Sequence, residues 1–328
     1  MTYRPWHGPG SRNAHEITTA EGTRMTLAPS GRQFEIAAGL HRATVVEVGG
    51  GLRSYHVGDR EVLQSYPVEA ICDAAHGAPL IPWPNRLGDG RYRFDGVDHQ
   101  VALSEPEKNN AIHGLMRWRP WEPVEYTDSR VVMSATLFPM PGYPFAIDVR
   151  IDYRLGEDGL TVTTTASNVG DDACPYGAGQ HPYLSPGRGS IDTCTVQMSA
   201  DTRILTDPVR QLPTGTEKVA ATAFDFRTPR ILGDQHLDDA FTGLTRGPDG
   251  RAWVRLTGND GRTVSLWVDD SYPVLELYTA DALAAGRRRR GLGTEPMTCP
   301  PNGFQSGDHV IRLEPGASVT TTWGVTLE

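Results

Sequence analysis

The stretch IDVRIDYRLGEDGLTVTTTA (147–166) decides the fold class of this chain. From Ile147 to Leu155 every second residue is apolar and the residues between them are charged, and the alternation resumes at Leu160 after Gly-Glu-Asp-Gly. A period of two is typical of a β-strand with one buried face. A short loop rich in Gly and Asp between two such runs is typical of a hairpin. The stretch therefore predicts an antiparallel hairpin.

The same pattern recurs along the chain and predicts further strands. A second hairpin is expected at 253–268, where two alternating runs flank Gly258-Asn259-Asp260-Gly261. Helical periodicity is scarce, and a helical turn or two is expected only at 25–38 and at 283–290. Single strands are expected at 43–48, 92–94, 130–137 and 319–327.

Composition agrees with a protein made of short strands and turns. The chain has 328 residues, of which 36 are Gly and 25 are Pro, about a fifth of the chain against a usual ~12%. This excess without a collagen repeat excludes a helical bundle. A length of 328 residues suggests about two domains. No linker or repeat divides the chain, however, so we expect one all-β domain over 1–328, a large antiparallel β-sandwich.

Charge and cysteine content exclude several functional classes. The net charge of −9 disfavours nucleic acid or an anionic membrane as the main partner. The four cysteines, Cys72, Cys174, Cys194 and Cys299, form no CxxC pair and are expected to be reduced. The first 16 residues contain no apolar signal segment, and no run of ~18 apolar residues occurs. We therefore expect a cytoplasmic protein, and the sequence leaves open whether it is a monomer or a homodimer.

Three residues in loop-like or Pro-rich segments are candidates for acid–base chemistry. His113 lies in NNAIHG (109–114) and His181 lies in GAGQHPY (177–183), directly before a proline. Glu295 is a lone acid in the segment LGTEPMTCPPNGF (292–304), where partial burial would tune its pKa. The alternative is structural: hydrogen-bonded histidines, and a surface glutamate that pairs with an arginine of the run 287–290.

Motifs for metal ions and nucleotide cofactors are missing from the sequence. HExxH, GxGxxG, the P-loop and GxSxG do not occur, so neither a metal nor a cofactor is expected. Trp83 and Trp118 lie beside the candidate loops, where a flat ring suits the C–H face of a sugar. For Trp253, Trp267 and Trp323, which fall on predicted strands, we expect packing in the core.

Six segments in the same order resemble those of the aldose 1-epimerases, also known as galactose mutarotases. The resemblance extends over roughly 35–325. It is carried by PLIPWPNRLGDGRYRFDG (79–96), NNAIHG (109–114), QHPYL (180–184), LDDAF (237–241), VLELYTAD (274–281) and TEPMTCPPNGF (294–304).

This resemblance implies a fold, a reaction and a set of site residues. The fold would be a twisted β-supersandwich with a sugar cleft on one sheet. By similarity Glu295 would be the general base, His181 the general acid with a pKa near or above ~6.5, and His113 a ligand of the ring oxygen or O1. The substrate would be a free hexose such as glucose or galactose. The expected sugar-binding residues are Asn85, Arg86, Trp118, Tyr183 and Asp238. Asp239 stands where the family often has His, so Asp239 is an alternative to Asp238.

Three other functions compete with this hypothesis. A hexose-6-phosphate 1-epimerase of the same fold could use the run Arg287–Arg290 to bind phosphate. A carbohydrate-binding protein without turnover would need the aromatic rings but no acid–base pair. A glycosidase would need two carboxylates across the site, such as Asp238 and Glu295, and would leave the histidines without a role.

Overall fold

Two large antiparallel sheets form the computed structural model, which describes residues 17–18, 24–25 and 27–328. The nine-stranded sheet has the order β12 (Glu122–Thr127), β13 (Arg130–Leu137), β14 (Ile147–Gly156), β15 (Gly159–Asn168), β29 (Ser318–Leu327), β25 (Thr263–Val268), β24 (Ala252–Thr257), β19 (Thr195–Met198) and β22 (Arg230–Ile231). The twelve-stranded sheet has the order β21 (Pro213–Lys218), β20 (Ala200–Thr206), β23 (Asp238–Leu244), β26 (Val274–Tyr278), β27 (Leu292–Met297), β18 (Tyr183–Leu184), β6 (Arg60–Leu63), β5 (Leu52–Val57), β4 (His41–Val46) and β3 (Gln33–Ala38). In addition, β17 (Gly179–Gln180) pairs with β27, and β7 (Pro79–Leu80) pairs with β17.

Short strand pairs and single-turn helices complete the described part of the chain. The pairs are β1 (Ile17–Thr18) with β2 (Arg24–Met25), β8 (Arg86–Gly88) with β11 (Asn110–Ile112), β9 (Arg91–Phe94) with β10 (Val97–Gln100), and β16 (Cys174–Tyr176) with β28 (Ile311–Leu313). The helical turns are η1 (Pro106–Lys108), η2 (Ile191–Thr193) and α1 (Gly303–Ser306).

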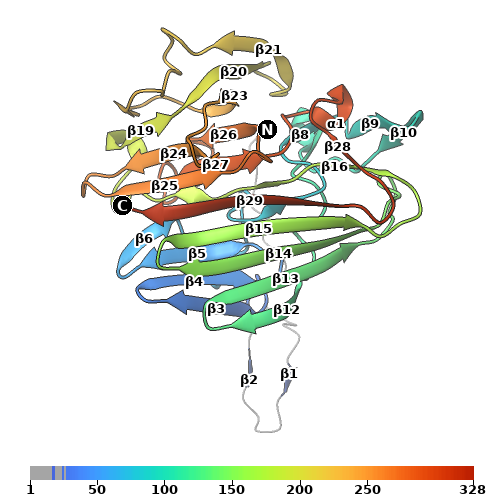
Figure 1. Cartoon of the computed structure of the whole chain (residues 1–328), viewed down its shortest axis with the longest axis horizontal. Helices are drawn as coiled ribbons and strands as arrows, with labels where there is room; N and C mark the ends of the chain where they lie inside the picture. The colour runs from blue at the N-terminus through green and yellow to red at the C-terminus, as the bar shows by residue number, and fades with distance from the viewer. Residues whose placement is uncertain (1–16, 19–23, 26) are drawn as a thin grey trace, which may run out of the picture.

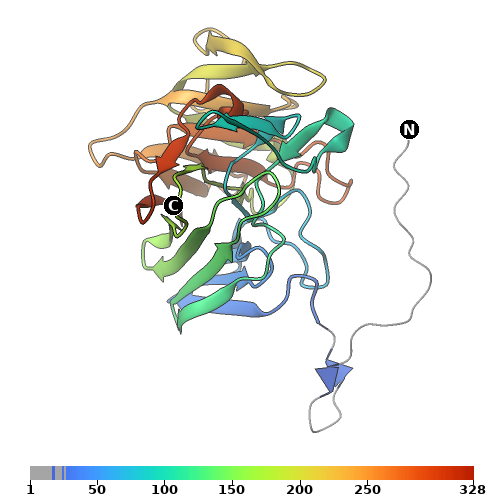
Figure 2. The same cartoon turned by 90° about the vertical axis from the view of Figure 1, so that its right-hand side faces the viewer.

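The core lies between the two sheets. In Figure 1 the blue strands β3 to β5 lie behind the green strands β13 to β15, and Figure 2 shows the two layers after a quarter turn. β14 contacts both β3 and β4, and its side chains share one buried cluster with those of β4, β5 and β29. Each fully buried Val, Leu or Ile stabilises this arrangement by about 1.5–3 kcal/mol.

The hairpin at 147–166 is confirmed. β14 pairs antiparallel with β15, and Gly156 stands opposite Gly159 across the turn. The five apolar residues of the alternating run in β14 are all at most 3% exposed, while Arg150 and Arg154 point to solvent. The period of two therefore placed this face correctly.

The other predicted strands are confirmed with small shifts at their ends. The hairpin at 253–268 is β24 and β25, the run 319–327 lies in β29, and 130–137 is β13. The strand expected at 43–48 begins earlier, at His41, and ends at Val46. Trp323 is buried as expected, but Trp253 and Trp267 are only half-buried. These two face each other across β24 and β25 on the outer face of the sheet, so core packing was wrong for them.

Of the two segments expected to hold a helical turn or two, the first is wrong and the second forms one turn. Residues 33–38 form β3, in which Phe34 and Ile36 are buried and alternate with polar neighbours, and pairing with β4 outweighs any helical tendency. Within 283–290 a single turn forms, where the carbonyl of Ala284 accepts the N–H groups of Arg287 and Arg288. Only Leu283 is buried in this segment, so nothing anchors a helix there.

Two sequence-based expectations concern cysteines and membrane segments. The four cysteines are free thiols, three of them buried. In the part of the chain that the structure describes, none of the helices has the length and apolar character needed to cross a membrane. The N-terminal stretch 1–16, in which no targeting signal is expected, lies outside the described residues.

Candidate active site

A cavity of about 490 Å³ opens over the twelve-stranded sheet, and acidic, basic and aromatic side chains line it. Asp238, Tyr278 and Glu295 come from the adjacent strands β23, β26 and β27. Side chains from the loops around β8, β11 and β17 complete the wall; they include Asn85, Arg86, His113 and His181. The structure therefore brings six of the eight predicted site residues to one cavity.

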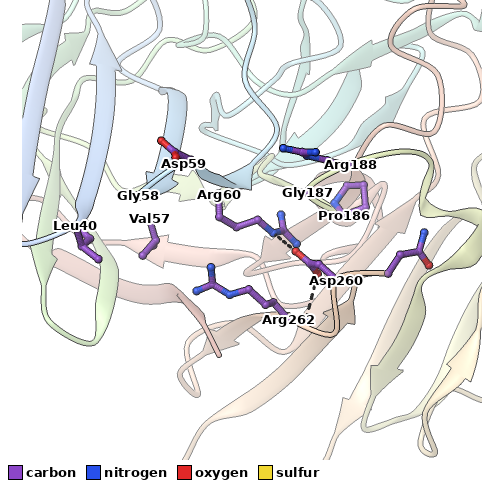
Figure 3. Close-up of a pocket in the computed structure, with 11 residues that line it drawn as sticks. Leu40, Val57, Gly58, Asp59, Arg60, Pro186, Gly187, Arg188, Asp260 and Arg262 are labelled. Atoms are coloured by element: carbon purple, nitrogen blue, oxygen red, sulfur yellow. Dashed lines mark hydrogen bonds and ion pairs between the residues drawn. The ribbon is translucent and has the colours of Figure 1, made fainter.

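A larger cavity, of about 710 Å³, lies at the loops that follow β5 and β24 (Figure 3). Arg60, Arg188 and Arg262 line it together with Asp59 and Asp260, and Arg60 Nε donates to Asp260 Oδ2 at 2.7 Å. No histidine lines this cavity, and its arginine–aspartate pairs offer no group that exchanges protons near neutral pH. The smaller cavity is therefore the better candidate for catalysis.

The floor of the site is a set of acidic side chains on one face of the sheet. β26 and β27 pair antiparallel with Glu276 directly opposite Glu295, and β23 pairs with β26 so that Asp238 stands opposite Tyr278. Directly opposed residues point to the same face. Burial raises the pKa of Glu295 well above its usual value, and the nearby Asp238 carboxylate raises it further.

His181 is held by backbone hydrogen bonds to residues 77–78 and by a stack of aromatic rings. Its backbone N–H donates to the Ala78 carbonyl at 3.1 Å, and its own carbonyl accepts the N–H of Gly77 at 2.9 Å. The imidazole stacks on the ring of Tyr183 with 4.9 Å between ring centroids, and Tyr183 stacks in turn on His76 at 4.3 Å. The plane of the His181 ring is therefore set by a buried aromatic stack.

Gln180, the residue before His181, joins the two sheets. Its Nε2 donates to the Tyr153 hydroxyl of β14 at 2.9 Å, and its Oε1 accepts Nε1–H of Trp323 of β29 at 3.1 Å. All three side chains are buried, so the position of His181 depends on the packing of one sheet against the other.

His181 and Glu295 form a direct pair. Nε2 of His181 lies 3.1 Å from Oε1 of Glu295, and the two residues are 4% and 3% exposed. The sequence-based expectation of a His181 pKa near or above ~6.5 does not hold for the buried imidazole. Burial lowers the pKa of His181 to about 3, with further contributions from His76 and Arg117, because the imidazolium is deprived of solvent. Burial therefore favours the neutral imidazole at His181 and opposes ionisation of Glu295.

His113 occupies a strained turn beside this pair. Its φ of 64° is in the left-handed region, and its Nδ1 accepts the backbone N–H of Asn85 at 3.2 Å. Burial lowers the pKa of His113 well below its usual value, so the neutral ring carries its proton on Nε2. The next residue, Gly114, also has a positive φ, and a Cβ there would lie 2.0 Å from the Ile81 carbonyl oxygen. This close approach explains the His-Gly motif.

Arg86 is the buried cation of the cavity. Its Nε donates to Glu105 Oε2 at 3.0 Å, and its Nη2 lies 3.7 Å from Asp238 Oδ2. Asn85, with a φ of 55°, accepts the Arg86 backbone N–H through its side-chain oxygen at 2.8 Å. Local hydrogen bonds thus aim the guanidinium between two carboxylates before any ligand binds.

The structure separates the two aspartates of LDDAF. Asp238 lines the cavity, whereas Asp239 is on the other face of β23 and pairs with Arg203, with 2.7 Å between Oδ1 and Nη2. Burial raises the pKa of Asp239. Asp238 is therefore the aspartate that faces a bound ligand.

Two of the predicted sugar-binding residues lie outside the cavity wall. Tyr183 is fully buried beneath His181, and its hydroxyl donates to the Ala74 carbonyl at 3.0 Å. Trp118 is 50% exposed, with the Arg117 guanidinium 5.3 Å from its ring centroid. Trp83 is buried against Phe304. Tyr183 supports the histidine instead of facing the cavity, because its neighbours on both sides are stacked rings.

Several residues that the sequence reasoning did not single out belong to the site. Glu105, Lys108, Arg117, Gln211, His236 and Tyr278 line the cavity. Glu276 lies beside Glu295 but does not line the cavity. A signal for Glu276 was available, since it is the one charged residue in the apolar strand VLELY, and a charge at a buried strand position is rare without a role.

Three side chains that line the cavity have a spacing that a metal ion could bridge. One ligand atom from each of His113, His181 and Glu295 lies within 4.8 Å of the other two. The His181–Glu295 contact also has the length of a hydrogen bond, and His113 Nδ1 already accepts a backbone N–H, so the same group has a geometry that suits proton transfer.

Comparison with known proteins agrees with the fold. The aldose 1-epimerase family model matches residues 32–326. The uncharacterised protein YihR of Escherichia coli K12 is 32% identical over 288 residues, which cover 88% of this chain and 90% of that protein. The aldose 1-epimerase of the same organism is 28% identical over 67% of this chain and 66% of its own length. The structure of an aldose epimerase homologue from Caenorhabditis elegans superposes with a TM-score of 0.81 at 20% identity, and covers 90% of this chain and 98% of its own.

The family match spans nearly the whole described chain, and the structural likeness extends over both sheets. The chain therefore belongs to the aldose 1-epimerase family and is an isomerase.

Proposed function

We propose that this protein is a mutarotase that interconverts the α and β anomers of a free hexose such as glucose or galactose. The observation that carries the proposal is the buried His181–Glu295 pair, with 3.1 Å between Nε2 and Oε1, at the wall of a polar cavity. Anomer exchange needs one group that accepts the proton of the C1 hydroxyl and one that protonates the ring oxygen. The two oxygens are bonded to the same carbon, so adjacent acid and base side chains suit the reaction.

Ring opening and ring closure each move two protons. Glu295 accepts the C1 hydroxyl proton, His181 gives a proton to the ring oxygen O5, and the C1–O5 bond breaks to leave an aldehyde at C1. Rotation about C1–C2 presents the other face of the carbonyl. O5 then attacks C1, its proton returns to His181, and the proton on Glu295 returns to O1 of the other anomer.

The proton count of the pair supports this sequence. Before ring opening the proton is on His181, and afterwards one proton is on Glu295, so the pair holds one proton throughout. A neutral His181 beside a protonated Glu295 has the same count as an imidazolium beside a carboxylate. Proton transfer along the 3.1 Å contact between Nε2 and Oε1 interconverts these two states without bulk solvent.

The remaining polar groups suit the binding of sugar hydroxyls. His113 offers Nε2–H to the ring oxygen or O1, because its Nδ1 is occupied by the Asn85 N–H. Arg86 and Asp238 provide a donor and an acceptor 3.7 Å apart, which suits a pair of neighbouring hydroxyls. Asn85 and its positive φ position both His113 and Arg86.

The hexose phosphate alternative loses the support of the arginine run. Arg287 pairs with Asp73, Arg289 pairs with Asp192 and Asp281, and none of the four arginines at 287–290 lines the cavity. A glycosidase would leave His181 without a function. A binding protein would have no use for two buried titratable groups in contact, which cost stability unless they are paired.

Polarimetry tests the proposal. Fresh α-glucose, α-galactose and α-glucose 6-phosphate are each followed with and without protein, and we expect a free hexose to mutarotate faster with it. Glu295→Gln and His181→Asn should each reduce the rate by ~10²–10⁴ with folding intact, while Glu157→Gln in the exposed β14–β15 turn serves as the control. Sugar binding with no change in rate, or a strong preference for the phosphate, would overturn the proposal.

A further inference from the structure

A second buried glutamate stands next to the expected base. Glu276 of β26 is 2% exposed and lies directly opposite Glu295 in the antiparallel pairing of β26 with β27. Directly opposed residues on one face have Cβ atoms ~4.5–5.5 Å apart, so the two carboxyl groups are neighbours. Glu276 does not line the cavity, and the mechanism above gives it no function.

The surroundings of the two glutamates differ. Glu276 stands opposite Ala240 of β23, and Val274 and Met297 follow it on the same face within a small apolar cluster. Glu295 instead faces the cavity and the His181 ring. The charged groups that act on Glu276 are Glu295, Asp238 and Asp239, which oppose its ionisation, and Arg86, which favours it.

Two neighbouring buried carboxylates cannot both be ionised without a large cost, because their repulsion adds to the loss of hydration. The pair therefore holds one proton over a wide pH range. The apolar cluster and three nearby carboxylates favour the neutral form at Glu276. Burial opposes ionisation of Glu295 as well, but its contact with the His181 imidazole and its access to the cavity make it the member of the pair that ionises.

Two unpaired side-chain oxygens also favour a proton on Glu276. Oε2 of Glu276 and Oε2 of Glu295 are both buried, and neither has a hydrogen-bond partner among the described residues. A proton on Glu276 would satisfy one atom of each group at once, as a donor from Glu276 to the free oxygen of Glu295. Such a bond to an ionised acceptor is stronger than one between neutral groups.

We propose that Glu276 is a positioning residue, which stays protonated through the catalytic cycle and donates a hydrogen bond to Glu295. The bond holds Oε2 of Glu295 and leaves Oε1 for His181 and the C1 hydroxyl. It also stabilises the carboxylate that accepts the sugar proton. The kinetic part of this inference rests on the proposed mutarotase activity, and the protonation of Glu276 does not.

Two variants at Glu276 separate the effect of its hydrogen-bond donor from the effect of filling its buried position. Glu276→Gln keeps the shape and an N–H donor but cannot ionise, whereas Glu276→Leu fits the apolar cluster and removes the donor. We expect Glu276→Leu to lower kcat by about 10-fold or more, because the Glu295 carboxylate loses a charge-assisted donor, with KM changed by less than about 3-fold. Glu276→Gln should restore most of the turnover. Thermal unfolding of both variants verifies that they fold.

An infrared measurement tests the protonation without substrate. The difference spectrum between the original protein and Glu276→Gln at pH 7 should show the loss of one protonated-carboxyl C=O band. A band that persists in Glu276→Gln would place the proton on Glu295 and overturn the proposal. Equal kcat values for the Leu and Gln variants would overturn the donor function. If the original protein fails to accelerate mutarotation, the mutarotase proposal fails, and the infrared result still decides the protonation of Glu276.

Discussion

The side-chain oxygen of Gln180 accepts the indole N–H of Trp323 at 3.1 Å across the interface between the two sheets. Gln180 precedes His181 in the chain, and Trp323 lies in the middle of β29 of the nine-stranded sheet. This bond, together with the one from Gln180 to Tyr153, couples the packing of the core to the position of the imidazole.

Removal of this link should lower both stability and turnover. Gln180→Leu leaves the Trp323 N–H and the Tyr153 hydroxyl without their buried partner, and we expect a loss of about 1–3 kcal/mol in the free energy of unfolding. Trp323→Phe removes one partner only and should cost less through this bond. Urea unfolding of the two single variants and the double variant measures the coupling. Strictly additive losses would contradict the link.

The two aspartates of LDDAF should differ in what they affect. Asp238→Asn changes a carboxylate that faces the cavity near Arg86, and we expect KM to rise by about 10-fold with little change in stability. Asp239→Asn weakens the pair with Arg203 and should lower the free energy of unfolding by about 1–3 kcal/mol. Steady-state polarimetry and urea unfolding of both variants check this division. The reverse pattern would make Asp239 the sugar ligand.

Stability should fall as the pH falls below ~6.5. Burial lowers the pKa of His76 to about 3, with Gln64 and Arg287 bonded to its ring, whereas an unfolded histidine titrates near ~6.5. Between these values the unfolded chain binds more protons than the folded one. The free energy of unfolding therefore decreases toward acid by up to about 1.4 kcal/mol per pH unit for each such histidine.

His76→Phe tests this dependence. The variant keeps an aromatic ring against Tyr183 and cannot titrate, so its stability at pH 7 should drop while the slope toward about pH 5 becomes shallower than that of the original protein. His309→Asn, on an exposed turn, provides the matched control. An unchanged slope in His76→Phe would mean that other groups dominate the acid sensitivity.

Chelation should leave mutarotation intact. The His181–Glu295 pair supplies both proton transfers, so we expect the same rate before and after dialysis against EDTA. Excess Zn²⁺ should inhibit, because His113, His181 and Glu295 present ligand atoms within 4.8 Å of one another, and a bound ion would occupy the pair. Loss of activity with EDTA and its recovery with a divalent ion would instead assign these residues to a metal centre.

The alternation from Ile147 to Leu155 was sufficient to predict β14, its buried face and the hairpin turn. Pleating places successive side chains on opposite faces whatever the strand pairs with, so this information is local. The same is true of Gly114, where the backbone needs a positive φ next to His113. Local patterns failed at 33–38, where pairing with β4 decided the conformation. At 283–290 the lack of burial limits the expected helix to one turn.

The sequence by itself determined the fold class, the family and six of the residues that line the cavity. Only the tertiary structure decided how these residues act on one another. It placed Asp238 in the cavity and Asp239 on the other face of β23, moved Tyr183 beneath His181, and engaged Arg287 and Arg289 in ion pairs away from the site. The opposition of Glu276 and Glu295 depends on the register of two strands. Register and inter-sheet contacts arise from pairing between distant segments, so a pattern along the chain does not contain them.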